Sequence, residues 1–266
     1  MIKNLLFIAV FKSLMWSQVG PPDDLRSNPP RSWALINGVI HTSPTKTIEN
    51  GTIVIRDGLI QSVGERIKIP NQATIIDLKG KHVYAGFIES WLDVKTSADD
   101  SSIVSHWNSN MRSHLKASSF FQLNEKNINE MRKLGFTSAH IAPKGGIFQG
   151  TSALIQLDKN SNVLSENISQ VIEYSYGGWS SSEYPTSLLG AIAFIRQGLI
   201  DADWYAKSKF ILEKYPDENE PIAVDRSLEI LGNAKNDKVP FIFRTNNEVY
   251  IDRSVNIGKE FDLDVW

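Results

Sequence analysis

Residues 84–94 decide the fold of this chain, and they read Tyr84-Ala85-Gly86-Phe87-Ile88-Glu89-Ser90-Trp91-Leu92-Asp93-Val94. The first half is apolar and is bounded by Gly80 and Gly86, which predicts a strand buried on both faces. The second half carries Glu89, Trp91 and Asp93. Barrels of parallel strands place their chemistry at the carboxyl ends of the strands. We therefore expect a functional site to include this end of the strand.

The composition is that of a globular protein without a strong charge. The chain has 266 residues, of which 41% are hydrophobic and 22% are charged, and its formal net charge is −2. This length suits one large domain or two modest ones. The weak charge does not favour binding to nucleic acid or to an anionic membrane surface. The absence of cysteine excludes disulfides, thiolate metal sites, a cysteine nucleophile and a lipid-anchor cysteine.

The N-terminus has the pattern of a secretory signal peptide over residues 1–18. A short basic start that contains Lys3 precedes an apolar run over residues 5–11, and Ser17 offers a small residue for cleavage. Lys12 interrupts the apolar run, so a frayed or interfacial helix is the alternative. The run is too short to span a bilayer. Residues 19–32 are rich in proline and predict a linker, and the expected location is periplasmic or secreted.

Residues 33–82 predict a small antiparallel β domain. Asn37-Gly38 is a strong turn dipeptide between two apolar runs. Arg56-Asp57-Gly58 lies between residues 52–55 and 59–63, which predicts a hairpin. A further strand is expected over residues 73–77. Several short strands within about fifty residues indicate a sheet of neighbouring strands, not a βαβ unit.

From residue 83 to residue 266 the pattern changes to alternating strands and helices. Apolar residues at helical spacing predict helices over 125–134, 186–205 and 248–261, and a shorter one from Asp225 or Ser227 to Ala234. Strands are expected over 136–142, 239–244 and 262–266. This alternation is typical of a sheet of parallel strands covered by helices.

These segments follow one another as in a known superfamily. Residues 34–38, 49–60, 63–64 and 76–81, followed by Gly86-Phe87-Ile88 and residues 132–138, resemble the amidohydrolase superfamily, in particular its imidazolonepropionase-like members. The resemblance implies a small β domain before a deformed (β/α)8 barrel. Such barrels hold one or two divalent metals, often zinc, which activate water to hydrolyse carbon–nitrogen bonds. The expected ligands are His-x-His after the first strand, Lys or Glu near the fourth, histidines at the fifth and sixth, and Asp at the eighth.

The metal-ligand positions of the resemblance are degenerate in this chain. The two histidines after the first strand correspond to Trp91 and Asp93, and the histidine of the fifth strand corresponds to Arg244. An indole does not ligate metal, a guanidinium repels it, and one carboxylate falls short of the three protein ligands of a zinc site. We therefore expect no metal cofactor in this chain. An Asp93–Arg244 ion pair in place of the metal is our specific hypothesis.

The fold class predicted is α/β, an incomplete (β/α)8 amidohydrolase-type barrel preceded by the small antiparallel β domain. The strand-six and strand-eight positions would lie beyond Trp266, and eight strands are needed to close a barrel. The chain is then a fragment of a longer reading frame, the first part of a tandem protein, or a short protein that pairs with a partner. The first two are favoured because an open parallel sheet exposes a bare edge. The expected partner is a C-terminal amidohydrolase domain or a second chain that completes the barrel.

Four histidines lie outside the ligand positions and have their own expected roles. His106 and His114 lie eight residues apart in a polar stretch and are expected at the surface. His140 lies on a predicted strand and could face the barrel interior. His82 precedes the first barrel strand and is expected to be structural.

Three further patterns have a functional and a structural interpretation. Glu89 and Asp93 could form an acid–base pair, although a salt bridge to Lys95 or Arg244 is the simpler expectation. The run over residues 144–153 resembles a phosphate loop only weakly, because a strand follows it, and a turn-rich loop is expected there. Aromatic residues near Gly177 could line a carbohydrate or peptide surface, or pack within the loop: Tyr174, Tyr176, Trp179 and Tyr184.

The sequence thus supports two functions. The first is the N-terminal portion of a secreted amidohydrolase-like hydrolase that acts on non-peptide carbon–nitrogen bonds, with its metal ligands lost in this segment. The second is a non-catalytic binding or scaffolding domain on the same fold.

Overall fold

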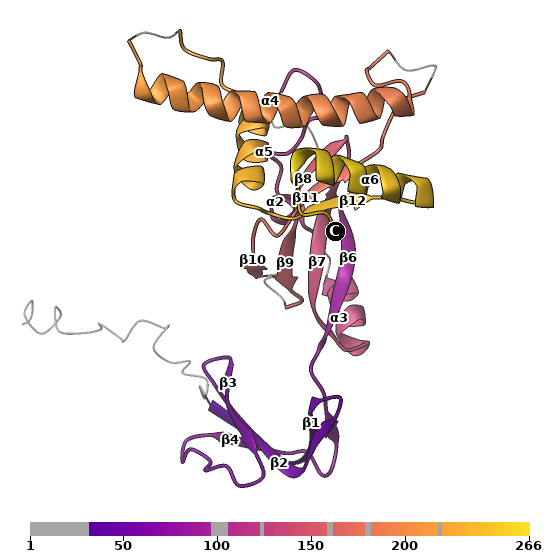
Figure 1. Ribbon diagram of the computed structural model, residues 1–266. Helices are drawn as coiled ribbons and strands as arrows, with labels where there is room; N and C mark the ends of the chain where they lie inside the picture. The colour runs from indigo at the N-terminus through magenta and orange to yellow at the C-terminus, as the bar shows by residue number, and fades with distance from the viewer. Residues whose placement is uncertain (1–31, 97–105, 123–124, 159–161, 179–181, 218–219) are drawn as a thin grey trace, which may run out of the picture. The chain divides into compact units, whose positions relative to one another are not determined.

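A computed structural model of the chain describes residues 32–96, 106–122, 125–158, 162–178, 182–217 and 220–266 (Figure 1). The predicted signal peptide, most of the linker and Trp179 lie outside the described residues. Packing divides the chain into two compact units, Met1–Ala85 and Gly86–Trp266. The chain passes from one unit to the other inside the stretch that decides the fold.

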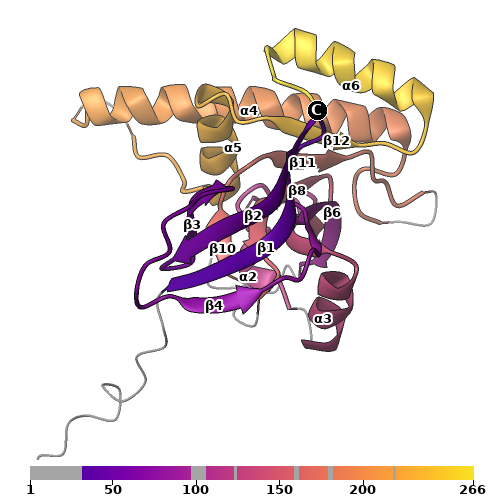
Figure 2. The same ribbon diagram turned by 90° about the horizontal axis from the view of Figure 1, so that it is seen from below.

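The first unit is one small sheet built on β1 (Ser32–Ser43) and β2 (Lys46–Arg56). The other strands are β3 (Leu59–Gly64), β4 (Thr74–Asp77) and β5 (His82–Val83). The order is β3-β2-β1-β4, with β5 also paired to β1, and Figure 2 shows the first four side by side. The predicted hairpin between β2 and β3 is confirmed. Asp57 and Gly58 both have positive φ, as the tight turn requires.

Two expectations for this unit are wrong. Asn37-Gly38 is not a turn, because β1 continues through it; Asn37 adopts a left-handed φ of 57° at a register shift in the strand. The sheet is also not antiparallel throughout, since β4 and β5 run parallel to β1. Residues 65–73 carry the chain back along the sheet before β4 begins. β4 therefore runs opposite to the direction it would have in a meander, where consecutive strands alternate in direction.

The second unit contains four strands that point in one direction. β6 (Phe87–Lys95) pairs in parallel with β7 (Phe136–Lys144), and β11 (Gln170–Glu173) pairs in parallel with β12 (Phe241–Arg244). β8 (Phe148–Thr151) and β9 (Ala153–Gln156) follow each other in the chain. β9 is antiparallel to β7, and β8 is antiparallel to β11. The four parallel strands therefore present their carboxyl ends on the same side.

These strands form two small sheets with the orders β10-β9-β7-β6 and β12-β11-β8, where β10 is Val163–Ser165. With the sheet of the first unit, the described residues thus contain three small sheets and no closed barrel. The α/β class is confirmed.

The run over residues 144–153 is a strand at its centre, not the expected loop. All four residues of β8 are buried, and β8 pairs with β11. A side chain at Gly150 would bring its Cβ to 2.3 Å from the carbonyl oxygen of Leu115. The glycine therefore serves the close approach of two backbones, which sequence alone does not distinguish from a turn.

The deciding strand β6 is not buried on both faces, contrary to expectation. The exposed fractions of Phe87 and Ile88 are 61% and 58%, and Val94 is the residue of β6 that is fully enclosed. Within the described residues β6 pairs with β7 alone, so it is an edge strand. The apolar run that predicts an interior strand here belongs to a strand with one open side.

The helices are close to their predicted places. α3 (Glu125–Lys133) and α5 (Arg226–Asn236) form where expected, and α6 (Glu248–Phe261) has the predicted bounds. α4 (Leu188–Lys214) runs nine residues past the predicted end, because residues 206–214 are mostly good helix formers. α2 (Ala117–Phe120) is one turn. The strand expected over 262–266 is reduced to a single bridge between Val265 and Phe241.

Side chains of α4, α5 and α6 pack with those of β8, β11 and β12 around Phe148, Leu231 and Phe241, which forms the larger core. Figure 1 shows α4 as the longest helix, with α5 and α6 close to it. A second core lies between α3, β6, β7 and β9. Among the described helices, none combines the length and the hydropathy that a membrane span needs.

Candidate functional site

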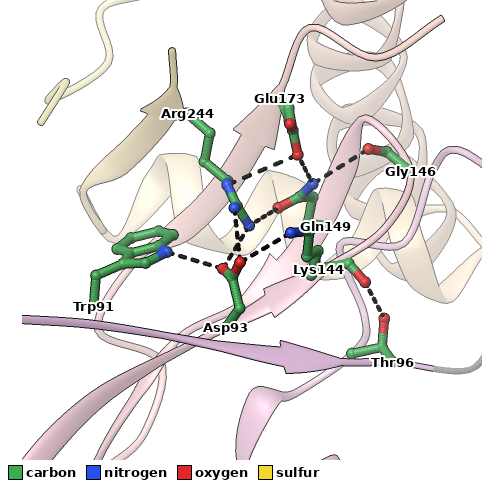
Figure 3. A network of polar contacts seen from close by, with 8 residues as sticks. All are labelled: Trp91, Asp93, Thr96, Lys144, Gly146, Gln149, Glu173 and Arg244. Atoms are coloured by element: carbon green, nitrogen blue, oxygen red, sulfur yellow. Dashed lines mark hydrogen bonds and ion pairs between the residues drawn. The ribbon is translucent and has the colours of Figure 1, made fainter. Parts of the chain in front are cut away.

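The carboxyl ends of β6 and β12 meet through a two-point ion pair. Asp93, near the end of β6, accepts from the guanidinium of Arg244, the last residue of β12. Arg244 Nη1 lies 2.9 Å from Asp93 Oδ1, and Arg244 Nη2 lies 3.1 Å from Asp93 Oδ2 (Figure 3). Two parallel N–H···O contacts are the strongest geometry for this pair of groups. The Arg244 side chain is 17% exposed and the Asp93 side chain is 34% exposed.

Trp91 completes this pair on one side. Trp91 and Asp93 are two residues apart on β6, so their side chains lie on the same face of the strand. The indole Nε1 donates to Asp93 Oδ1 at 2.9 Å. The guanidinium carbon of Arg244 lies 5.3 Å from the centre of the indole ring, within the range of a cation–π contact. The structure thus brings together the three residues that the resemblance assigns to metal-ligand positions.

Lys144, Gln149 and Glu173 extend the cluster. Lys144 Nζ at the end of β7 donates to Asp93 Oδ2 at 3.1 Å. Glu173 Oε2 at the end of β11 lies 3.8 Å from Arg244 Nε and accepts from Gln149 Nε2 at 2.5 Å. Gln149 Oε1 accepts from Arg244 Nη1 at 3.3 Å. Two cations and two carboxylates therefore balance each other (Figure 3).

None of these three residues was among the site residues expected from the sequence. Lys144 and Glu173 are the last residues of β7 and β11, so the end-of-strand rule applied to every strand would have found them. Gln149 lies in the middle of β8, within the run expected to be a loop, and no local signal marks it.

The carboxyl of Asp93 is held in its charged form. Burial raises the pKa of Asp93, but the hydrogen bonds from Arg244, Lys144 and Trp91 lower it by more than burial raises it. The resulting pKa lies below the ordinary aspartate value. Asp93 therefore acts as a permanent anion in this cluster at neutral pH. It has no proton to give and little tendency to take one.

Glu89 does not join Asp93 as an acid–base pair. Its Oε1 accepts from the backbone N–H of Trp91 at 3.3 Å, which ties it to its own strand. Of the two partners expected for a salt bridge with Asp93, Lys95 and Arg244, Arg244 is the one that forms it, and Lys144 forms a second.

The histidines lie apart from the ion pair, with one exception. His140 on β7 contacts the edge of Trp91 with ring centres 5.7 Å apart, and its Nδ1 lies 3.1 Å from the carbonyl oxygen of Ser90. His140 Nε2 is buried with no partner among the described residues. His106 and His114 are half-buried rather than fully exposed: His106 packs on Phe194, and His114 Nδ1 lies 2.7 Å from Ser227 Oγ.

His82 has the structural role expected for it. Its ring nitrogen Nδ1 lies 2.8 Å from His41 Nε2, and both rings stack with Tyr84 in the first unit.

The aromatic residues near Gly177 have different surroundings. Tyr174 is 7% exposed and bonds to Ser254 Oγ, and Tyr184 donates to the carbonyl oxygen of Gly190. Tyr176 is 46% exposed and lines a cavity of about 290 Å³, whose wall also contains Tyr174, Glu173, Arg244 and Tyr250. Packing within the loop therefore accounts for Tyr184, whereas Tyr174 and Tyr176 both face the cavity.

The cluster does not fit a divalent metal. No group of three or more His, Asp or Glu side chains in the described parts of the chain is arranged to hold one. The one carboxylate at the predicted positions, Asp93, already faces two cationic groups within 3.1 Å. A metal cation there would be repelled by Arg244, which remains charged at any ordinary pH. The site chemistry is thus that of a compensated salt-bridge network.

Comparison with known proteins supports the fold. No protein-family model and no curated protein matches the sequence. An amidohydrolase from Thermotoga maritima of known structure is similar over 87% of this chain and 63% of its own length, with a TM-score of 0.70 and 20% sequence identity. The chain thus spans less than two thirds of that protein.

Two other solved structures match less closely. An amidohydrolase matches over 88% of this chain and 65% of its own, with 14% identity and a TM-score of 0.40. A prolidase in complex with N-methylphosphonate-L-proline covers the same shares, with 15% identity and a TM-score of 0.43. Neither likeness is close enough to carry an argument. The similarity to the Thermotoga protein confirms the resemblance at the level of fold: the chain has the fold of part of an amidohydrolase.

Proposed function

We propose that this chain is the N-terminal portion of a secreted amidohydrolase-like hydrolase that acts on non-peptide carbon–nitrogen bonds, with its share of the metal site replaced by an ion pair. The observation that carries the proposal is the Asp93–Arg244 pair. It joins the carboxyl ends of two strands, which is where a barrel enzyme holds its reacting groups. The first function predicted from the sequence is the one that this geometry supports best.

The ion pair provides a physical substitute for a metal. A metal between strand ends neutralises the carboxylates around it and ties the strands together. Arg244 supplies a fixed positive charge and two donors to Asp93, and Lys144 supplies a third. The pair therefore keeps β6, β7 and β12 together at their carboxyl ends. Catalysis would require residues supplied from outside this chain.

The partner proposed is a C-terminal amidohydrolase segment, on the same polypeptide or on a second chain. Four parallel strands are half of the eight that close a barrel. Within the described residues, β6 has one strand neighbour, and β12 has one beside the bridge to Val265. No described strand pairs with the second side of β6, which favours pairing with a further strand there. On the second side of β12, Phe241 is already bonded to Asp264 and Trp266. The open edge of β6 supports a partner that supplies the missing strands.

The alternative function is a non-catalytic binding or scaffolding domain. It is favoured by the saturation of the cluster, in which Asp93 and Gln149 both bond to Arg244. A site whose polar groups satisfy one another has little left to offer a reacting molecule. The exposed Phe87 and Ile88 on β6 would then contact a protein partner.

The coding sequence beyond Trp266 separates the two functions. Continuation into strands that carry new histidines and an aspartate would support the hydrolase portion. A stop codon followed by unrelated sequence would contradict it and leave the scaffolding function. As a second check, the purified chain alone, supplied with zinc, should not hydrolyse cyclic amides such as imidazolone or hydantoin. Turnover abolished by Asp93→Asn would contradict the loss of the site.

Secretion is part of the same proposal and rests on residues 1–18. Expression in a bacterial host followed by N-terminal sequencing of the protein in the periplasm or medium tests it. A mature start just after residue 18 supports secretion. Retention of Met1 in the cytoplasm contradicts it.

A further inference from the structure

The long helix α4 carries a stripe of apolar side chains on the side that faces away from the core. Its other side, with Ile195, Leu199 and Ala202, is buried in the larger core. The outward side carries a row of exposed apolar residues, which we call the α4 stripe: Leu189, Ala193, Ile200, Trp204 and Ile211. In Figure 1, α4 lies at the top of the second unit, with the labelled strands and the other helices below it.

The spacing of these residues makes the α4 stripe continuous along the helix. Successive helical residues are about 100° apart around the axis, so all members of the stripe lie within about 60° of one another. Leu189 is 77% exposed and Trp204 is 58% exposed. The single charged residue in the same sector is Lys207. A helix that is apolar on opposite sides is typical of one that is covered on both, and α4 therefore has the surface of a helix with a second partner.

Further barrel strands would not cover the α4 stripe. α4 and α5 connect β11 to β12, two strands that already pair with each other. In a barrel, the helices that connect two neighbouring strands pack on those strands, and any further strands extend the sheet at its edge. The stripe faces away from the sheet. Its partner is thus different from the C-terminal segment proposed above.

The order of residues along the α4 stripe matches a second copy of the same helix in the antiparallel direction. With a twofold axis at the level of residue 202, positions equally far on either side of that level face each other. Ile200 then lies opposite Trp204 of the second copy, and Ala193 lies opposite Ile211. Lys207 lies opposite the neutral Gln197. Apolar side chains therefore meet apolar side chains, and no like charges meet within the stripe.

The area of the α4 stripe suits a weak dimer. α4 has 27 residues. It is therefore about 40 Å long, and a contact strip as wide as the helix covers about 400–480 Å² on each copy. A hollow of about 370 Å³ beside the stripe, lined in part by Phe210 and Ile211, adds to the surface that a second copy would contact. A total near 1,000 Å² lies at the low end of specific protein interfaces.

We propose that two copies of this chain associate through α4, with the two helices antiparallel about a twofold axis near residue 202. Trp204 lies close to this axis and is the central anchor of the interface. The stripe contains no residue of the Asp93–Arg244 cluster. The inference is therefore independent of the proposed hydrolase function, and either can fail without the other.

Sedimentation velocity of the purified chain, from about 1 to 500 µM, tests the association. We expect a reversible monomer–dimer equilibrium with a Kd on the order of tens of micromolar, as an interface of this size implies. Trp204→Glu should weaken it by at least about thirtyfold, the loss of a central anchor. The matched control is Leu134→Glu, at an apolar residue after α3 that is 72% exposed, which should dimerise as the unmodified chain does.

Three results of this experiment would overturn the proposal. One is a chain that stays monomeric up to 500 µM, which would assign the stripe to a different molecule. Another is a dimer that survives Trp204→Glu. The third is an equal loss of dimer in Leu134→Glu.

Engineered cysteines test the antiparallel register, because the chain has no cysteine of its own. Chains with Ala193→Cys are mixed with chains with Ile211→Cys and are then oxidised. The mixture should form disulfide-linked dimers, since the two positions face each other. Ala193→Cys chains alone should not, because the two copies of that residue would lie about 27 Å apart along the helix axis. No cross-link in the mixture, or an equal yield from Ala193→Cys chains alone, would overturn the proposal.

Discussion

Asp93, Arg244 and Trp91 determine the chemistry of this site at the scale of single residues. Each is unsuited to a metal in its own way, and together they form a network in which every group has a partner. A bidentate guanidinium–carboxylate pair is stabilised by the attraction of its charges, and an aromatic ring beside the guanidinium adds a cation–π contact. The three residues that stand where metal ligands would be expected thus bind one another instead of a metal.

Replacing Asp93 tests the contribution of this network to stability. Asp93→Asn leaves Arg244, which is 17% exposed, with Glu173 at 3.8 Å as its remaining carboxylate. After allowance for solvent screening, we expect a loss of about 1–2 kcal/mol in the free energy of unfolding, measured in urea. The control is Asp262→Asn, which breaks the ion pair with Lys238 at a side chain 92% exposed and should change little. Equal effects of the two substitutions would contradict the account.

The same pair predicts a pH dependence. The folded pKa of Asp93 lies below its unfolded value of about 3.9, so its stabilisation is complete above that value and is lost as pH falls through the folded pKa. The difference in unfolding free energy between the unmodified chain and Asp93→Asn should stay constant from pH 7 to about pH 5. It should then shrink as the solution is acidified. A difference that grows on acidification would show that the pKa of Asp93 is raised.

The sequence predicted part of this site and missed the rest for a physical reason. Trp91, Asp93 and Arg244 could be identified because the resemblance to the amidohydrolase superfamily assigns them to metal-ligand positions. Lys144, Gln149 and Glu173 join the network through contacts between strands 24 to 95 residues apart along the chain. Only the folded sheet specifies such contacts.

At the scale of elements, the helices could be predicted from the spacing of their apolar residues and from the residues that cap their N-termini. α6 matches its prediction because Asn247 caps it, and α5 because Asp225 does. β6 shows the limit: an apolar run predicts a strand but does not tell whether neighbours cover both sides. β8 shows a second limit of prediction from sequence. Gly150 permits close contact between two backbones, and in the sequence such a glycine looks the same as a glycine in a turn.

The packing of α4 onto β8 depends on the absence of a side chain at Gly198. A Cβ there would lie 2.5 Å from Met111 Cε and 2.7 Å from Phe148 Cε2, and Phe148 is fully buried. Gly198→Val should therefore reduce the free energy of unfolding by about 1–3 kcal/mol. Ala193→Val, on the exposed face of the same helix, is the control. A loss at Gly198 no larger than at Ala193 would show that the helix lies farther from the strand.

At the scale of the whole molecule, the chain has the fold of part of an amidohydrolase, with four parallel strands and, within the described residues, β6 at an open edge. The order of strands and helices was within reach of the sequence because it follows from local patterns. The mixed pairing of the first sheet and the insertion of β8 and β9 between β7 and β11 were not, since strand direction depends on where distant segments meet.

Metal content tests the central claim that an ion pair replaces the metal at these strand ends. The purified chain is dialysed against zinc, then against buffer, and its metal is measured by mass spectrometry. The account predicts far less than one zinc per chain, unchanged in Asp93→Asn. Stoichiometric zinc that survives dialysis and is lost in Asp93→Asn would contradict it.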